Sequence, residues 1–429
     1  MQRLKLELHR LLRLSEQFTK TDMVYLAKGG FFLTLTQISS AIISLILTIA
    51  FANLIPKETY GTYRYMLSIY TLVAILALPG IDTAVTQSVS KGFDYSLIDG
   101  FKAKFKFSIL GTLASFFFSA YYFVNDNTTL GTIFAIVAIA LPFMESPTVL
   151  ASFFNGKKLF PMWALMDIAS QIISASSMIT AIFLTKNIFF IVIAYFLPLI
   201  VVRMGWYFWA KKKLVKNTDS DNRLFGYGKS LTIFQIMSRA TASIDQIVLF
   251  HFLGPAQLAI FSLAQAIPNR IQSLLKITGT LAFPKFAERD SKEIAKTLPR
   301  KLFLLVPIII LGCVLYVFIA PYLFTYIFPK YYESLLYSQV LVFYTLSAIS
   351  YPFSSYLLAH KKMKENYILS FTGIAVKIIV LIALVPVIGI WGAIVSILTS
   401  SLIVTLLSFY FLKKTSPSVI DVQTKIEQQ

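Results

Sequence analysis

The sequence predicts an all-α polytopic membrane protein of about twelve transmembrane helices, in two six-helix lobes related by pseudo-two-fold symmetry. Three observations predict this class: high hydrophobicity, repeated long apolar runs and a partial internal repeat. Of the 429 residues, 57% are hydrophobic and 14% charged, against roughly 25% charged in ordinary soluble domains. The mean hydropathy is +0.72. A chain of this composition is expected to lie in a membrane.

The apolar runs have the length of membrane-spanning helices. A helix that crosses a hydrocarbon layer of roughly 30 Å needs about 20 residues. Strands of a membrane barrel would be about half as long and would alternate in polarity, which these runs do not. The predicted spans are 28–53, 63–89, 107–124, 130–154, 161–184, 187–209, 229–253, 258–284, 301–326, 335–360, 367–386 and 390–412.

The positive charge is distributed asymmetrically between the loops. Most of the 39 Lys and Arg residues fall before the first run, in alternate loops and in the tail, whereas the opposite loops hold only Lys57, Lys186 and Lys330. By the positive-inside rule both termini are expected in the cytoplasm. The net charge of +19 therefore sets topology and contacts membrane lipids rather than nucleic acid.

The chain is expected to divide into two lobes. Segment 33–55 aligns on 231–253 without a gap, with Gln37 matching Gln235 and Ser40 matching Ser238. An even number of spans separates these segments, so the halves are parallel repeats about an axis along the membrane normal. The predicted divisions are an amphipathic segment 1–27, lobes 28–209 and 229–412, an inter-lobe loop 210–228 and a tail 413–429.

Several chemistries are not expected. Cys313 is the only cysteine, so neither an intrachain disulfide nor a thiolate metal cluster can form. The predicted outer loops are short and no catalytic motif was found, which disfavours an enzyme of glycan assembly. We expect no catalytic residue, no bound metal and no cofactor.

Charged side chains inside the predicted spans are the candidate functional residues. Each costs roughly 2.5–3.5 kcal/mol near the bilayer centre, so they should line water or pair. Snorkelling towards the span ends is one explanation for Arg64, Arg203 and Asp82. The basic residues are Arg64, Arg203, Arg239, Arg270, Lys276 and Lys377, and the acids are Asp82, Glu145, Asp167 and Asp245.

Arg239 and Asp245 lie in one span but cannot neutralise each other. Six positions correspond to about 240° around a helix, beyond the i,i+3 and i,i+4 pairs. Each therefore needs another partner or water, and cavity lining and buried ion pairing both remain open. A cavity with Arg239, Arg270, Lys377, Lys276 and Arg64 would suit a phosphate or pyrophosphate.

The acids are candidates for ion coupling. Glu145 lies between Pro142 and Pro147, where proline frees backbone carbonyls and bends a helix. A carboxylate there can exchange protons during a conformational cycle or can simply cap the freed groups. Asp245, Glu145, Asp167 and Asp82 are the coupling candidates, with H⁺ or Na⁺ as the ion.

Three stretches resemble the polysaccharide transporters of the MOP flippase superfamily. They are "ANLIPKETYGTYRYMLSIYTLVAILALPGIDTAVTQSVSKG" (52–92), "SIDQIVLFHFLGPAQLAIFSLAQAI" with the later "FPKFAE" (243–288), and "VPVIGIWGAIVSILTSSLIVTLLSFYF" (385–411). In the second stretch Asp245 occupies a recurring acidic position. Residues 258–261 depart from the usual Gly-Tyr pair, and the N-terminus exceeds the usual short lead.

The resemblance implies a Wzx-type flippase. Such a protein carries undecaprenyl-pyrophosphate-linked oligosaccharide, as in O-antigen or capsule assembly, from the cytoplasmic to the periplasmic leaflet of a bacterial inner membrane. Alternating access, ion coupling and other polysaccharide-assembly proteins as partners are also implied. The alternatives are a cation-coupled multidrug or metabolite exporter of the same superfamily and an enzyme of glycan assembly.

Overall fold

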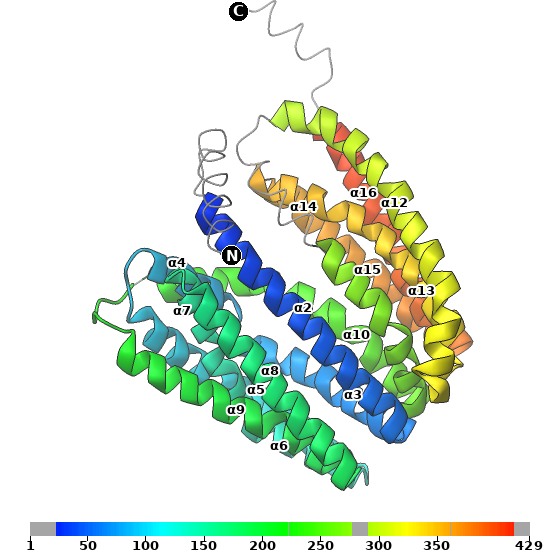
Figure 1. Ribbon diagram of the computed structural model, residues 1–429, viewed down its shortest axis with the longest axis horizontal. Helices are drawn as coiled ribbons and strands as arrows, with labels where there is room; N and C mark the ends of the chain where they lie inside the picture. Colours follow the sequence, from blue (N-terminus) through cyan, green and yellow to red (C-terminus); the bar gives the residue numbers. More distant parts are fainter. Residues whose placement is uncertain (1–22, 222, 277–290, 361, 416–429) are drawn as a thin grey trace, which may run out of the picture. The chain divides into compact units, whose positions relative to one another are not determined.

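The computed structural model describes residues 23–221, 223–276, 291–360 and 362–415, which are almost entirely helical (Figure 1). No strand occurs within these ranges. They contain ten helices long and apolar enough to cross a membrane, or eleven if one bent pair counts as a span. The predicted all-α polytopic class is confirmed. The remaining predicted span, 258–284, ends outside the described residues.

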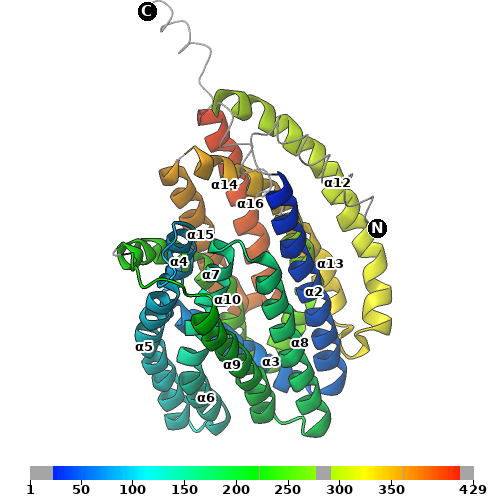
Figure 2. The ribbon, with the colours of Figure 1, turned by 60° about the vertical axis from the view of Figure 1, so that its left-hand side comes forward.

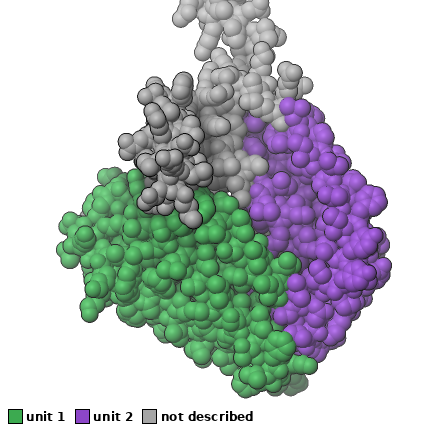
Figure 3. All heavy atoms as spheres, in the orientation of Figure 1, with its two compact units in different colours: residues 1–47, 70–236 green, residues 48–69, 237–429 purple. Residues whose placement is uncertain are grey.

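The chain forms two compact units, coloured separately in Figure 3. Unit 1 groups residues up to Leu47 with Tyr70–Ile236, and unit 2 groups Thr48–Ile69 with Met237 onwards. The chain thus passes between units inside helices α2 (Met23–Leu54), α3 (Lys57–Val73) and α10 (Leu224–Ala264). The predicted lobes 28–209 and 229–412 follow the internal repeat instead, and that division stays a prediction.

Unit 1 is built on packed helical hairpins (Figure 2). Helix α5 packs on α6, and α9 packs on both α6 and α8. Asn127 and Asn187 accept hydrogen bonds from the backbone amides of Leu130 and Phe189 and so cap α6 and α9. Its further elements are η1 (Ala74–Ala77), α4 (Gly80–Ser90), α5 (Ser96–Val124), α6 (Thr128–Glu145), η2 (Ser146–Thr148), α7 (Val149–Gly156), α8 (Phe160–Leu184) and α9 (Ile188–Lys213).

Unit 2 contains the rest of α10 and the C-terminal helices. Gly254 breaks α10 with φ 82° and ψ 179°, a conformation open to glycine, and Pro255 begins the next helical stretch. After Gln265 a helical segment runs over 266–276. The remaining elements are α12 (Ser291–Tyr326), η3 (Pro329–Tyr331), α13 (Ser334–Leu341), η4 (Val342–Ile349), α14 (Ser350–Ala359), α15 (Met363–Ile388) and α16 (Ile390–Thr415).

Several predicted spans are wrong in detail. Span 63–89 is not one straight helix, because Leu78 adopts a left-handed conformation before Pro79 and the two parts meet at 50°. Span 107–124 starts too late, since α5 begins at Ser96. Span 335–360 is confirmed as one span, Ser334–Leu357, but it consists of α13, η4 and α14 rather than one regular helix. Hydropathy registers apolar length but carries no information about such breaks.

Two motif glycines allow α10 to approach the preceding helices. A Cβ on Gly61 of α3 would lie 1.7 Å from the carbonyl oxygen of Pro255 in unit 2. A Cβ on Gly80 of α4 would lie 2.2 Å from the carbonyl oxygen of Gly228 in unit 1. The Gly80 amide also donates to the Thr232 hydroxyl at 3.1 Å. Glycine is required at both positions because any side chain would push the helices apart.

The stretch after α9 is docked on unit 1 rather than extended as a free linker. The Lys216 amide donates to Asp94, and the Asp94 amide donates to Asn217. Asp221 accepts from the Ser88 hydroxyl at the end of α4. Asp94 also pairs with Lys157. Carboxylate, amide and hydroxyl groups therefore hold Lys216, Asn217 and Asp221 of the predicted inter-lobe loop against the end of α4 and the turn that follows it.

Candidate functional site

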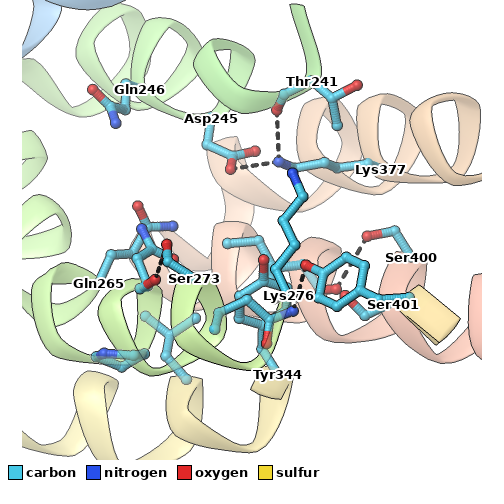
Figure 4. A pocket seen from close by; sticks show the side chains of 16 residues that line it. Thr241, Asp245, Gln246, Gln265, Ser273, Lys276, Tyr344, Lys377, Ser400 and Ser401 are labelled. Carbon is cyan, nitrogen blue, oxygen red and sulfur yellow. Dashed lines mark hydrogen bonds and ion pairs between the residues drawn. The ribbon is translucent and has the colours of Figure 1, made fainter. Parts of the chain in front are cut away.

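A polar cavity of about 460 Å³ lies within unit 2 (Figure 4). It is formed by α10, the helical segment 266–276 and the helices from α13 to α16. Amide, hydroxyl and charged side chains dominate its wall, although the surrounding helices are strongly apolar. The polar lining consists of Thr241, Asp245, Gln246, Gln265, Asn269, Gln272, Ser273, Lys276, Tyr344, Tyr351, Lys377, Ser400 and Ser401.

An ion pair joins α10 to α15 at this cavity. The Lys377 ammonium lies 2.7 Å from a carboxylate oxygen of Asp245 and donates to the Thr241 carbonyl at 2.9 Å, as Figure 4 shows. Their side chains are 11% and 6% exposed. Asp245 and Lys377 therefore combine the two alternatives, buried ion pairing and cavity lining, because they pair with each other at the cavity wall.

Two buried acceptors of the cavity wall have no hydrogen-bond partner among the described residues. One is Oδ1 of Asp245 and the other is Oε1 of Gln272. The Gln272 amide nitrogen is fully engaged with Ser347 and Tyr351, at 2.9 and 3.0 Å, which fixes the orientation of its carbonyl oxygen. A buried acceptor is costly unless a donor reaches it. The wall is thus suited to a molecule that carries hydroxyl donors.

Unit 2 also contains two arginines that influence each other, Arg64 of α3 and Arg270 of the segment 266–276. Arg64 and Tyr60 lie within electrostatic range of Arg270. Arg64 Nε is buried and has no hydrogen-bond partner in the described part of the chain. Two guanidinium groups held near each other repel unless an anion lies between them. Arg270 directly follows Asn269, which lines the cavity.

In unit 1 the acids Asp82 and Glu145 meet a lysine that sequence reasoning missed. Lys104 of α5 is fully buried, and its ammonium lies 2.9 Å from Asp82 and 3.9 Å from Glu145. Asp82 thus pairs with a buried ammonium, although its own side chain is 26% exposed. Asp167 accepts a hydrogen bond from Gln171 and lies within range of the Arg203 charge.

The predicted site residues thus fall into separate groups. Asp245, Lys276 and Lys377 line the cavity, Arg64 lies near Arg270, and Asp82 and Glu145 meet at Lys104. Arg239 is half-buried on α10 but is not among the cavity-lining residues. One cavity was expected to hold Arg239, Arg270, Lys377, Lys276 and Arg64, but only Lys276 and Lys377 are among its lining residues.

A detectable signal for the missed residues was present in the sequence. Gln246, Gln265 and Gln272 are amides within apolar runs, and polar groups inside a membrane also require partners. Lys104 was harder to detect because Lys102 and Lys106 flank it, so the trio reads as a basic loop. The apolar run 107–124 gave no sign that α5 begins eleven residues earlier, at Ser96, so that Lys104 lies inside the helix.

A sequence profile described as "Polysaccharide biosynthesis protein" matches residues 26–290, more than half of the chain. The chain belongs to this family. Among curated proteins, it is 22% identical to an uncharacterized membrane protein of Methanocaldococcus jannaschii, over 90% of this chain and 84% of that protein.

The fold is similar to that of MATE transporters of the MOP superfamily. An inward-facing multidrug resistance MATE transporter superposes with TM-score 0.60 and 12% identity, covering 88% of this chain and 96% of the other. A eukaryotic MATE transporter gives TM-score 0.58 and 13% identity, with 91% and 97% covered. The predicted polysaccharide family is confirmed by the profile, and the fold agrees with that of the MOP superfamily. The long apolar helices of the described residues support the predicted multi-pass membrane protein.

Proposed function

We propose that this protein is a flippase for undecaprenyl-pyrophosphate-linked oligosaccharide, such as an O-antigen or capsule repeat unit. It would move this lipid from the cytoplasmic to the periplasmic leaflet of a bacterial inner membrane by alternating access. Both termini would lie in the cytoplasm, and other polysaccharide-assembly proteins would supply and use the substrate. Cycling would be coupled to H⁺ or Na⁺.

The chemistry of the unit 2 cavity carries this proposal. Sugars present many hydroxyl donors and acceptors, which amides, hydroxyls and the free acceptors of Asp245 and Gln272 can bind. The tyrosines Tyr344 and Tyr351 add flat apolar surface beside these polar groups. Family membership in polysaccharide biosynthesis agrees with a sugar as the bound group.

Arg64 and Arg270 would bind the pyrophosphate of the same lipid. Guanidinium groups bind phosphate oxygens through two parallel hydrogen bonds, and a shared phosphate would relieve the repulsion between them. Lys276 would contribute a further positive charge at the cavity. Arg239, outside the cavity lining, would act on the anion only through its longer-range field.

Charge disfavours a cationic drug as substrate. Two lysines and one aspartate line the cavity, and the aspartate is already paired with Lys377. A drug cation would meet a wall with a net positive charge and would pay the repulsion in a low-dielectric environment. The multidrug exporter remains the second candidate only through fold similarity.

Reconstituted transport tests the proposal. The full chain in liposomes would receive a polyprenyl-pyrophosphate oligosaccharide with a fluorophore on its sugar, and an impermeant quencher would report leaflet exchange. We expect the wild-type protein to exchange the glycolipid between leaflets. In the Arg64→Met/Arg270→Met double variant the exchange rate should fall about tenfold, which corresponds to the loss of one charge-assisted contact. Lys212→Met, an exposed lysine in the last turn of α9, is the control. Transport of ethidium without exchange of the glycolipid would overturn the proposal.

A further inference from the structure

An open cavity of about 400 Å³ lies along α4 in unit 1 and shares no lining residue with the unit 2 cavity. Its volume falls within the roughly 300–1,000 Å³ that is typical of small-molecule sites. We call it the α4 cavity. Every side chain in its lining carries a polar group: Asp82, Thr83, Thr86, Gln87 and Ser90 of α4, Ser152 of α7 and Tyr227 of α10.

One face of α4 provides most of this wall. Asp82, Thr86 and Ser90 recur every four residues, and Thr83 and Gln87 lie beside them, so helical geometry places all five on one side. The opposite side packs into the core of unit 1, so α4 keeps an accessible polar face within a strongly apolar chain. The residues on that buried side are Ile81, Ala84, Val85 and Val89.

The wall is polar but carries no uncompensated charge. Asp82 is the one carboxylate in the lining, which contains no Lys, Arg or His. The fully buried Lys104 donates to both oxygens of Asp82, at 2.9 and 3.1 Å, and so neutralises it. The side chains of Thr83 and Gln87 form no hydrogen bond within the described ranges. Their hydroxyl and amide groups therefore remain available to a neutral ligand.

Close backbone contact places Tyr227 beside this face. Tyr227 directly precedes Gly228, and a Cβ on Gly228 would lie 2.5 Å from the Ile81 side chain. One turn later, the Thr232 hydroxyl accepts from the Gly80 amide at 3.1 Å and donates to the Gly228 carbonyl at 2.9 Å. Glycine at position 228 thus lets α10 approach α4, and Tyr227 lines the cavity while it stays 42% exposed.

These groups together provide the chemistry that binds a sugar ring. A tyrosine offers a flat apolar face, on which the C–H face of a pyranose can pack while its hydroxyls bond to amide and hydroxyl side chains. A phosphate would meet no cation among the lining residues of the α4 cavity. In the unit 2 cavity, by contrast, Lys276 and Lys377 outnumber Asp245. The α4 cavity therefore suits an uncharged sugar.

We propose that the α4 cavity is a second glycan-binding site, which takes one neutral sugar of the oligosaccharide. Helix α4 ends at Ser90 and is followed by Lys91, the first lysine of a loop that the positive-inside rule predicts in the cytoplasm. The site thus binds the glycan on the cytoplasmic side, before translocation. This inference rests on the proposed function and adds a sugar contact from unit 1.

Binding to the purified full chain in detergent tests the site with two probes. One is the polyprenyl-pyrophosphate oligosaccharide of the exchange assay, and the other is the same polyprenyl pyrophosphate without sugar. The wild-type protein should bind the first probe more tightly. Tyr227→Ala should reduce this difference in affinity about tenfold and Gln87→Ala about fivefold, through loss of a ring contact and of a hydrogen bond. Neither variant should change the affinity for the sugar-free lipid.

Two control variants distinguish a specific ring contact from a general effect. Tyr227→Phe keeps the ring and should keep most of the sugar-dependent affinity. Tyr121→Ala removes a tyrosine of similar exposure, 51%, in the last turn of α5, and should leave that affinity unchanged. Tyr227 and Gln87 are exposed, so their variants should also keep the wild-type thermal midpoint.

Cysteine labelling locates the bound sugar. The only native cysteine, Cys313, is buried, so Ser90→Cys adds one accessible thiol at the cavity. At a concentration of ten times its Kd, the oligosaccharide probe should slow the reaction with a soluble maleimide about tenfold, because only the unoccupied fraction reacts. The sugar-free lipid should not slow it. Asn125→Cys, at an exposed position directly after α5, should react equally under all conditions.

The outcomes separate this site from the proposed function. Unchanged sugar-dependent affinity in Tyr227→Ala and Gln87→Ala, an equal loss in Tyr121→Ala, or an unprotected thiol in Ser90→Cys would overturn the site alone. Equal affinity of the wild type for the two probes would reject both the site and a glycan as substrate. Sugar binding that depends on these residues, without glycolipid exchange in liposomes, would reject the transport function and support the site.

Discussion

Lys377 of α15 and Asp245 of α10 form a buried ion pair at the wall of the unit 2 cavity, with 2.7 Å between nitrogen and oxygen. The pair joins segments that are distant in sequence. The second oxygen of Asp245 has no hydrogen-bond partner among the described residues. One oxygen of Asp245 therefore joins the two helices, and the other is the acceptor that we propose for a sugar hydroxyl.

A double-mutant cycle separates these two roles. Asp245→Asn or Lys377→Met alone leaves a charge without its partner, which should cost a few kcal/mol, below the roughly 3–5 kcal/mol of a fully enclosed pair because the cavity admits water. The double variant should regain most of that stability, measured by thermal unfolding in detergent, but should not regain glycolipid exchange. Recovery of exchange in the double variant would contradict a ligand role for Asp245.

Gly61 should not tolerate a side chain. In Gly61→Ala the methyl group would meet the Pro255 carbonyl, and the resulting overpacking should lower stability by about 1–3 kcal/mol. Gly312→Ala is the matched control, since no atom lies within 4 Å of its Cβ position. That change should leave the thermal midpoint equal or slightly raised. Equal midpoints in the two variants would contradict the close approach of α3 and α10.

The docking of residues 214–221 on unit 1 should depend on pH. The Ser88 hydroxyl and the Arg223 backbone amide donate to Asp221 and hold the pKa of this carboxyl below its ordinary value of 3.8. A lowered folded-state pKa contributes stability that is present above the ordinary value and is lost as pH falls through the lowered value. Docking should therefore weaken in acid below about pH 4.

Hydrogen exchange of this stretch measures the effect. Asp221→Asn at neutral pH imitates protonation, and Ser88→Ala removes the main donor. Each should raise exchange about two- to fivefold, as expected for a screened surface contact. Asp219→Asn is the control, because this exposed neighbour gives no ion pair within the described residues. If Asp219→Asn raised hydrogen exchange as much as Asp221→Asn does, a specific contact between Ser88 and Asp221 would be contradicted.

The membrane class and the family could be predicted from the sequence, because lipid imposes apolar length on every span and the motif stretches are contiguous. The partner of Asp245 could not be predicted, because Lys377 reaches it only through the packing of α15 on α10. The break at Leu78 also left no hydropathy signal. Gly61 and Gly80 belonged to the motifs that carried the resemblance, but their role as contact points required the backbone of α10.

The sequence predicted the types of residue at the candidate site better than it predicted their arrangement in space. Charges inside apolar runs predicted Asp82, Glu145 and Asp245 as candidates, and each lies within 4 Å of a lysine ammonium. Their grouping depended on two facts that were absent from the pattern, the true start of α5 and the position of Lys104 within it. Arg239 shows the opposite error, since its central place in a span did not put it at the cavity wall.

The buried Lys104 has a consequence for biogenesis. An isolated α5 entering lipid would carry an unpaired ammonium at a cost of up to roughly 3.5 kcal/mol. Because chains are synthesised from the N-terminus, Asp82 of α4 is already in place when α5 emerges, and Glu145 arrives later with α6. The order of synthesis thus provides the lysine with a neutralising partner first and adds the second carboxylate to an assembled pair. Removal of Asp82 would therefore impair the membrane insertion of α5 before it affected later folding or transport.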